Sequence, residues 1–356
     1  MKVVLKFIAA VFITALTVVV LYAAYLFISY HRLGNMSLTP MGSVKRTAVP
    51  GEEYLMVSWN IGFGAYESDY SFFMDGGKES RARSPERLDN NLRAIADLLA
   101  AEGADYILAQ EVDTYADRTF RMDEREYLKE ALPADRYVSV FAQNFDSPYL
   151  FYPLTDPHGA SESGIETFSR AKIKSARRIE LPVEAGVMKI LDLDRCYSVS
   201  RIPTEDGREF ILYNVHLSAY TSDGTVATEQ LRLLVADMQA EYEKGNICVA
   251  GGDFNKDLLG DSTRYWKAEK TDHAWAKPVP TELFDGLDLT LVVPFDENDP
   301  VPSCRNADAA YHEGQFVLTV DGFIVSDNVE VLSSEVIDTG FAYSDHNPVR
   351  LRFSFR

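Results

Sequence analysis

Five strand-like apolar runs, each with polar side chains at or near its end, constrain this 356-residue chain more than any other feature. Successive residues of a strand alternate between the two faces of a sheet, so residues two apart project to the same side. Runs that end at one sheet edge can therefore pool their polar groups in one site. The runs are 54–60, 106–111, 210–217, 247–255 and 316–325, and their polar residues are Asn60, Glu111, Asn214, His216, Asp253, Asn255 and Asp321.

Two short strings near the C-terminal end carry the most chemistry. Gly-Gly-Asp-Phe-Asn (251–255) closes an apolar run with a carboxylate and an amide, and Ser-Asp-His-Asn-Pro (344–348) places a carboxylate beside an imidazole. Together they supply oxygen ligands for a metal ion and, in His346, a side chain that titrates near neutral pH, as a general base requires. This combination favours hydrolysis of a phosphoester.

In this order along the chain, the motifs resemble those of the endonuclease/exonuclease/phosphatase superfamily. That superfamily includes DNase I-like nucleases, abasic-site endonucleases, neutral sphingomyelinases and inositol-phosphate phosphatases. Any one motif arises easily by chance, whereas the ordered set on strand-like runs is specific. The resemblance covers residues 52–356 and implies an α/β fold, a four-layered sandwich of two packed mixed β-sheets flanked by helices. It also implies a metal-dependent hydrolase of phosphodiesters or phosphomonoesters.

The resemblance implies a catalytic role for several of these side chains. His346 would take a proton from the attacking water, and Asp321 would orient the imidazole and stabilise the imidazolium. Asp253 and Asn255 would position the nucleophile and the phosphate. His216 would contact the phosphate or the leaving-group oxygen.

The cofactor expected from the resemblance is Mg²⁺, with Mn²⁺ as an alternative. Mg²⁺ takes oxygen ligands and keeps several waters, so one or two carboxylates suffice. Glu111 is the best ligand candidate, with Asn60 beside it, and Asp345 would help to hold metal-bound water. Arg305 lies where relatives often carry a substrate-contacting Thr-x-Arg, but Ser303 replaces the threonine, and a solvated surface arginine is the alternative.

Simpler interpretations exist for several of these residues. A histidine on an apolar strand, such as His216, is often a buried residue with satisfied hydrogen bonds. Asn60 can cap a turn, and the Asp-Gly pair that begins at Asp321 can mark a turn or bulge. Asn214 can simply brace the site.

The N-terminus carries a second prediction. Residues 7–28 contain no charge and follow a short tail, 1–6, that holds Lys2 and Lys6. About 20 apolar residues span a bilayer, so this stretch predicts a transmembrane helix. Its length and the absence of a good cleavage site favour an uncleaved signal-anchor, with a buried core helix as the alternative. The lysines before it favour an extracytoplasmic catalytic domain, although basic residues on the other flank weaken this argument.

The remaining chain predicts a linker at 29–51 and one catalytic domain at 52–356, since about 300 residues fit a single large domain. Ser84 and Pro85 predict the start of a helix that Gly103 closes, and a second helix is predicted over 229–244. Both lead into runs that carry site residues. Three cysteines give no disulfide framework, and the sequence indicates no protein partner.

Charge bears on the substrate. Lys and Arg total 35 against 54 Asp and Glu, and affinity for duplex DNA comes largely from Lys and Arg. Small or membrane-borne phosphoesters therefore gain weight over nucleic acid. Aromatic residues in two predicted long loops, 62–84 and 144–164, could stack a base, insert at a lipid interface or merely pack locally. A surface nuclease acting on DNA or RNA is one alternative function. The other is a catalytically silent binding module of the same fold, which would not require the whole polar set.

Overall fold

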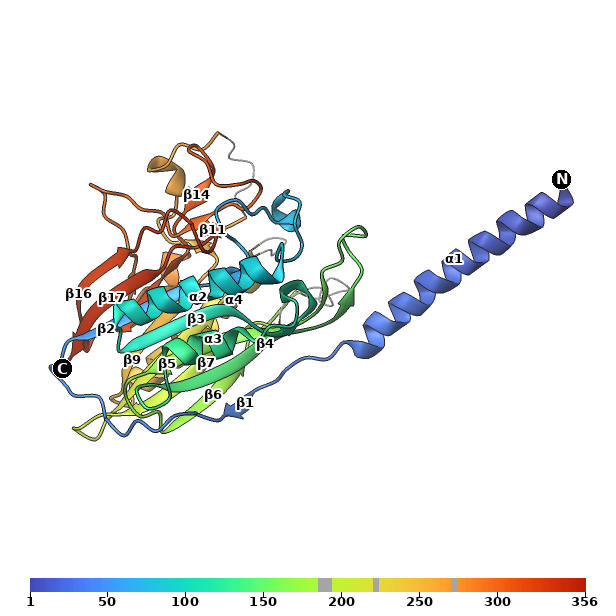
Figure 1. Cartoon of the computed structure of the whole chain (residues 1–356). Coiled ribbons are helices and arrows are strands. Elements are labelled where there is room, and N and C mark those ends of the chain that lie inside the picture. The colour runs from blue at the N-terminus through green and yellow to red at the C-terminus, as the bar shows by residue number, and fades with distance from the viewer. Residues whose placement is uncertain (185–193, 220–223, 270–274) are drawn as a thin grey trace.

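Two packed mixed β-sheets with helices on their outer faces form the domain that follows the N-terminal helix (Figure 1). The computed structural model describes residues 1–184, 194–219, 224–269 and 275–356. One sheet has the order β16 (Val329–Val336), β17 (Val349–Phe355), β2 (Tyr54–Asn60), β3 (Tyr106–Ala116), β5 (Gly159–Ser169) and β4 (Val138–Leu150). The other has the order β1 (Met36–Leu38), β6 (Ser175–Glu180), β7 (Cys196–Pro203), β8 (Glu209–His216), β9 (Ile247–Asp253), β15 (Asp321–Ser326) and β12 (Leu289–Val292).

Each sheet contains one parallel pair of strands joined by a helix. α2 (Pro85–Glu102) connects β2 to β3, and α4 (Thr225–Tyr242) connects β8 to β9. α3 (Glu124–Ala131) packs with α2, and short 3-10 helices and strand pairs lie in the connections. These smaller elements are η1 (Gly62–Gly64), η2 (Phe73–Asp75), η3 (Asp117–Thr119), η5 (Ser262–Arg264), η6 (Thr281–Phe284), the pair β10 (Lys256–Asp257) and β11 (Lys277–Pro278), and the pair β13 (Cys304–Arg305) and β14 (Val317–Leu318).

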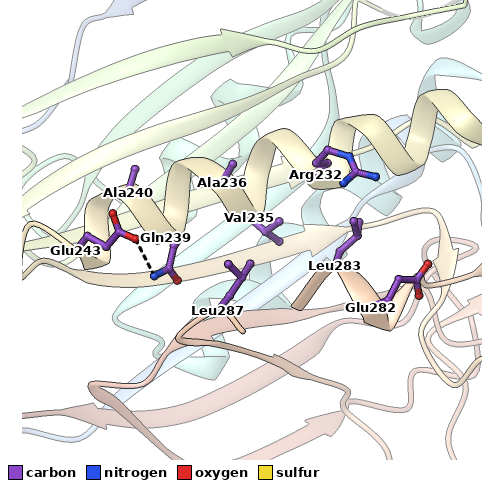
Figure 2. Close-up of a pocket in the computed structure, with 9 residues that line it drawn as sticks. All are labelled: Arg232, Val235, Ala236, Gln239, Ala240, Glu243, Glu282, Leu283 and Leu287. Atoms are coloured by element: carbon purple, nitrogen blue, oxygen red, sulfur yellow. Dashed lines mark hydrogen bonds between the residues drawn. The ribbon is translucent and has the colours of Figure 1, made fainter. Parts of the chain in front are cut away.

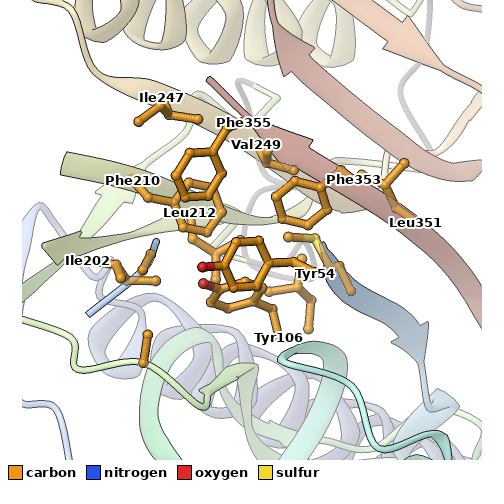
Figure 3. Close-up of a cluster of buried hydrophobic side chains, with 14 of the residues drawn as sticks. Tyr54, Tyr106, Ile202, Phe210, Leu212, Ile247, Val249, Leu351, Phe353 and Phe355 are labelled. Carbon is orange, nitrogen blue, oxygen red and sulfur yellow. The ribbon is translucent and has the colours of Figure 1, made fainter. Parts of the chain in front are cut away.

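The four layers explain why the strands read as continuous apolar runs. Strand β2 buries Tyr54 and Met56 between the sheets, while the alternate residues Val57 and Trp59 pack with α2. A strand covered on both faces needs apolar residues at every position. Between the sheets, aromatic rings from both layers pack together, with the Tyr106 and Phe210 ring centroids 5.1 Å apart (Figure 3). The predicted four-layered α/β sandwich is confirmed.

Both predicted helices are present. The Ser84 hydroxyl caps α2 by accepting a hydrogen bond from Arg87 N, and Gly103 ends the helix with φ 62°. α4 begins at Thr225, four residues before the predicted start, directly after Gly224 with φ 78°. The turn Thr-Val-Ala-Thr has only weak helical periodicity in its sequence, but its Ala227 is buried. Packing, and not periodicity, therefore sets this end of the helix.

Two predicted elements differ in the structure. The run 316–325 is not one strand: its first part pairs with Cys304–Arg305 as β14, and β15 begins at Asp321 on the neighbouring strand β9. The segment 144–164 is not a long loop, because most of it extends β4 and β5 into a projecting hairpin. In both cases the partner strand decides the structure, and the local sequence does not specify the partner.

The N-terminal helix α1 (Lys2–Ser29) projects away from the sandwich and buries none of its residues (Figure 1). It is long and apolar enough to cross a membrane, and a signal sequence would pass the same test. The segment after it is tied to the domain. Met36–Leu38 pairs with β6 as β1, and Met41 exchanges backbone hydrogen bonds with Ser139. The predicted linker 29–51 therefore runs along the domain surface, and its boundaries stay a prediction.

Candidate active site

The polar ends of the strands meet at one edge of the sandwich. Asn60 ends β2, and His216 and Asp253 end the parallel strands β8 and β9. His216 lies opposite Asp253 in the strand register, and Asp253 lies opposite Asp321, the first residue of β15. The two parallel units thus bring their carboxyl ends together, where ligands of open α/β sheets generally bind.

Two glycines allow β9 to deliver Asp253 to this edge. A Cβ on Gly252, which has φ 152°, would lie 2.0 Å from the carbonyl oxygen of Val215. After them, Asn255 adopts φ 49°, a left-handed conformation that asparagine tolerates better than most residues. Its backbone N–H donates to Asp253 Oδ1 at 2.8 Å, and its side-chain amide donates to Leu217 O at 2.8 Å. The turn after β9 is therefore fixed by its own side chains.

His346 is held at its ring and at its backbone. Its Nδ1 lies 2.8 Å from Asp321 Oδ2, and its carbonyl oxygen accepts a hydrogen bond from the indole N–H of Trp59 at 2.8 Å. Burial alone lowers the pKa of His346, but the negative charges of Asp321 and Asp253 outweigh it and raise that pKa well above its usual value. With Nδ1 committed to Asp321, only Nε2 is left to exchange a proton with a substrate or water.

A second histidine faces the same carboxylates. His216 Nε2 lies 3.6 Å from Asp253 Oδ2 and 3.8 Å from Glu111 Oε1. Burial lowers the pKa of His216 well below its usual value, and the charges of Arg195 and His346 add to this effect. Burial raises the pKa of Asp253 to about 7. The pKa of His346 is thus raised and that of His216 lowered. Such opposite pKa shifts are typical of sites in which one group transfers a proton and another donates a hydrogen bond.

Asn60 links the two sheets at the site. Its side-chain amide donates to Glu111 Oε1 at 3.1 Å and to Asp253 Oδ2 at 3.0 Å, and its Oδ1 accepts from Gly62 N at 3.0 Å. Ser344 Oγ donates to the Asn60 carbonyl oxygen at 2.8 Å. This geometry goes beyond a turn cap, because one amide joins the carboxylates of two strands.

Glu111 lies at a bulge in β3 and adopts φ 55°, which is costly for a residue with a long side chain. The bulge interrupts pairing with β5 between Ala109 and Val112 and turns the carboxylate toward the site edge. Its side chain is 27% exposed, unlike the nearly closed Asp253. A carboxylate that remains accessible beside buried ones is suited to hold a cation.

The donor set fits a divalent cation. Among the residues that the structure describes, Asp253, Asp321 and His346 each offer one ligand atom, and these atoms lie within 4.8 Å of one another. Glu111 adds an accessible carboxylate, and burial raises the pKa of Asp345, on the adjoining loop, to about 6. Such a concentration of carboxylates in one place is stabilised when a cation compensates their charge.

Asn214 and Arg305 contact the framework. The Asn214 amide accepts a hydrogen bond from Gln110 Nε2 at 2.8 Å and donates to Glu166 O at 3.0 Å, so it joins the two sheets below the site. Arg305 is fully buried, and the interpretation as a solvated surface arginine is wrong. Its guanidinium donates to the backbone carbonyls of Glu67, Tyr70 and Ala309 and anchors the 62–84 loop. Contact with a phosphate by Arg305 stays a prediction.

Three neighbours of the site were not assigned a role from sequence. Ser303 Oγ donates to Asp321 Oδ2 at 2.7 Å, and Cys304 Sγ lies 3.5 Å from His346 Nε2. Burial raises the pKa of Cys304 to about 12, so it remains a thiol. Arg195, whose charge acts on His216, is buried. The position of Ser303, in place of the threonine of relatives, was the only sequence signal for this group.

The site is distinct from the shallow hollow between α4 and η6, which Val235, Gln239, Leu283 and Leu287 line (Figure 2). That hollow shares no residue with the cluster at the strand ends. It contains mostly apolar and surface groups and none of the paired carboxylates and histidines that chemistry on a phosphate requires.

At the strand ends, the imidazole of His346 lies within a few ångströms of carboxylates, and a second histidine, His216, faces the same carboxylates. Such an arrangement can serve the hydrolysis of a phosphoester. The sequence profile of the Endonuclease/Exonuclease/phosphatase family matches residues 57–346, and the chain belongs to that family. It is accordingly a hydrolase of the phosphoesterase class.

Solved structures share the fold at low sequence identity. An endonuclease/exonuclease/phosphatase from Beutenbergia cavernae superposes with a TM-score of 0.57 at 16% identity, covering 85% of this chain and 72% of that one. The human Nocturnin catalytic domain with bound sulfate gives 0.55 at 19% identity, covering 90% and 97%. ANGEL2, a 2′,3′-cyclic phosphatase in complex with adenosine-2′,3′-vanadate, gives 0.55 at 15% identity, covering 90% and 99%. A search of curated proteins found no match.

Proposed function

We propose that this chain is a membrane-anchored, Mg²⁺-dependent phosphoesterase that hydrolyses a phosphodiester by direct attack of water. The observation that carries the proposal is the His346–Asp321 pair, with its 2.8 Å contact, beside Asp253 and His216. An imidazole with one nitrogen fixed by a carboxylate presents the other nitrogen as a base, as in catalytic triads.

The proton and the leaving group follow from the two histidines. His346 Nε2 takes a proton from water as the water oxygen forms a bond to phosphorus. The bond between phosphorus and the leaving oxygen breaks, the leaving oxygen takes a proton from solvent, and His346 afterwards returns its proton to solvent. His216, kept neutral by burial, can donate a hydrogen bond from Nε2 to a phosphoryl or leaving oxygen. Asp253 and Asn255 would place the water and the phosphate.

Glu111, Asn60 and Asp345 would hold the cation. When bound, Mg²⁺ or Mn²⁺ supplies positive charge that stabilises the charge developing on the phosphoryl and leaving oxygens, and it offsets the carboxylates that raise the pKa of His346. The Asn60 amide holds the Glu111 and Asp253 carboxylates in place by donating a hydrogen bond to each. Buried Asp321 Oδ1 and His216 Nδ1 have no hydrogen-bond partner among the residues that the structure describes, which points to further ligands or water in the site.

The substrate is proposed from charge and from the N-terminal helix. The chain has a formal net charge of −19, which disfavours long stretches of nucleic acid. We expect α1 to be an uncleaved signal-anchor, with the catalytic domain on the extracytoplasmic side. A membrane-borne or small phosphodiester then fits better than duplex DNA, and a surface nuclease is the alternative.

The test is hydrolysis by the full chain, in detergent or nanodiscs, with Mg²⁺ or EDTA. The substrates are a plasmid, an aryl phosphodiester, an aryl phosphomonoester, sphingomyelin and an inositol phosphate. The proposal expects turnover of a diester that EDTA abolishes. Plasmid nicking as the fastest reaction would favour the nuclease. Turnover of the monoester alone, or turnover that EDTA does not change, would overturn the proposal.

A further inference from the structure

The C-terminal part of α1 is fastened to the β4–β5 hairpin. Tyr22 Oη donates to Tyr149 O at 3.1 Å and accepts from Phe151 N at 3.1 Å, and Tyr25 Oη accepts from Tyr149 N at 3.0 Å. The Tyr22 and Phe151 rings meet edge to face with centroids 5.2 Å apart. Two helix tyrosines thus pair with the backbone of the projecting hairpin.

The chain that follows α1 is fixed to the same side of the domain. His31 Nε2 lies 3.0 Å from Asp146 Oδ2 on β4, and Arg32 contacts Asp194 Oδ1 at 3.2 Å. Arg32 also donates to Leu181 O at 2.8 Å. Contacts from Tyr22 through Arg32 hold the helix and the domain in one relative orientation, so a membrane around α1 would meet the domain in that orientation.

The hairpin tip exposes apolar side chains next to this junction. We use "hairpin tip" for Phe151, Tyr152 and Leu154, which are 51%, 68% and 83% exposed. Exposed large apolar side chains gathered in one place mark an interaction surface. One acid, Asp156, is exposed near the tip, and the Ser80 hydroxyl donates to its carboxylate at 3.2 Å. The tip thus presents apolar groups and few charges.

The length of α1 places the hairpin tip at the membrane surface. A helix rises 1.5 Å per residue, so the roughly 30 Å hydrocarbon core takes about 20 residues. Counted from Phe7, the first residue of the uncharged stretch, that length ends near Leu26, so Tyr22 and Tyr25 lie in the last turns of the span, next to the interfacial layer. Tyrosine is enriched in this layer, where its ring is apolar and its hydroxyl is hydrated or bonded. Phe151, which packs on Tyr22, comes to the same level.

We infer that the hairpin tip, together with Tyr22 and Tyr25, inserts into the interface of the bilayer that α1 crosses and fixes the catalytic domain on it. The inference rests on the proposed anchoring by α1. The occupant is a lipid surface, because the tip is continuous with the membrane helix and is apolar. The strongly acidic chain disfavours anionic lipid, so insertion into a zwitterionic surface depends on apolar contact and not on charge.

This orientation brings the site close to the bilayer. Tyr152 packs on Phe73 with ring centroids 5.7 Å apart, and His158 Nδ1 lies 2.9 Å from Ser80 O. Both contacts belong to the 62–84 loop, whose Gly62 approaches Asp345 so closely that a Cβ would lie 3.0 Å from Asp345 Oδ1. The 62–84 loop therefore contacts both the hairpin that carries the tip and the site at Asp345.

The test uses the full chain in phosphatidylcholine nanodiscs, with a Leu154→Cys variant labelled by an environment-sensitive fluorophore. The native cysteines are buried, so the label goes to the new thiol. The matched control is Leu332→Cys, 43% exposed on β16, the opposite edge strand of the same sheet. Quenching by lipids brominated in the upper acyl chain is expected to be about twofold or more at residue 154 and absent at 332, and unaffected by salt.

If bromine in the lipid leaves the emission at residue 154 unchanged, as it does at residue 332, the inference is overturned. Recovery of the chain from membranes without residues 1–29 would also overturn it. If Leu154→Cys does not fold, Tyr152→Cys carries the same test. Tyr22→Phe, which removes the hydroxyl that bonds the hairpin, should reduce the quenching at 154. Because quenching needs no turnover, quenching without hydrolysis would contradict only the proposed chemistry, and hydrolysis without quenching would contradict only the membrane contact.

Discussion

Replacing Asp321 by asparagine tests the orientation of His346 most sharply. Asp321 Oδ2 accepts from Ser303 Oγ at 2.7 Å and contacts His346 Nδ1 at 2.8 Å. Asparagine at this position can turn its amide N–H toward Nδ1, because the serine hydroxyl can rotate to accept or donate. The imidazole would then carry its proton on Nε2, the nitrogen that must accept one from water.

The expected loss in kcat is about three to four orders of magnitude, the size seen when a triad carboxylate is neutralised, which corresponds to about 4–5 kcal/mol in the barrier. The assay is the initial rate on the best substrate of the panel, with thermal unfolding measured in parallel. Asp285→Asn, an exposed position, is the matched control. A loss below about tenfold in a normally folded Asp321→Asn protein would refute the orienting role of Asp321.

Three further predictions concern the metal, a buried acid and the glycine turn. Glu111→Gln should raise the Mg²⁺ concentration for half-maximal activity by about 10- to 100-fold, and an unchanged metal titration would contradict its role as a ligand. Burial raises the pKa of Glu166 to about 8, so the folded state holds this proton more tightly and stability falls as pH rises from about 4.5 to 8, by as much as about 5 kcal/mol. In Glu166→Gln the midpoint of thermal unfolding should depend less on pH in that interval; equal slopes would contradict the assignment. Gly252→Ala should lower the free energy of unfolding by more than about 1 kcal/mol. The control is Gly286→Ala, where a Cβ meets no atom within 4 Å and the loss of stability should be smaller. Equal losses in denaturant unfolding would show that the contact with Val215 is unimportant.

Local pattern accounts for much of the fold. The helix from Ser84 to Gly103 follows from a cap, a proline and a 3.6-residue repeat, all of which act within one segment. The strands that carry Asn60, His216 and Asp253 follow from apolar runs that two packed layers require.

The features that could not be predicted from the sequence depend on pairing between segments that are distant in the chain. Asp321 starts β15 and is not inside a longer strand, because Val317–Leu318, shortly before it, pair with β13 instead of β9. The bulge that turns Glu111 toward the site depends on the register of β3 with β5. The hydrogen bond from Ser303 to Asp321 forms only when the residue before β13 meets the start of β15. The β4–β5 hairpin read as a loop because its polar and aromatic residues show no clean alternation, and pairing between strands alone reveals it.

The most direct measurement of the central claim is the hydrolysis rate of wild type and His346→Ala on one aryl phosphodiester, each with Mg²⁺ and with EDTA. His312→Ala is the matched control, because His312 is exposed and its Nδ1 lies 3.0 Å from the backbone carbonyl oxygen of Ala310. The account predicts a fall of about two to four orders of magnitude for His346→Ala in Mg²⁺, and wild-type activity for His312→Ala. EDTA should abolish turnover by every variant. Wild-type rates from folded His346→Ala, or turnover that survives EDTA, would contradict a metal-dependent reaction with His346 as its base.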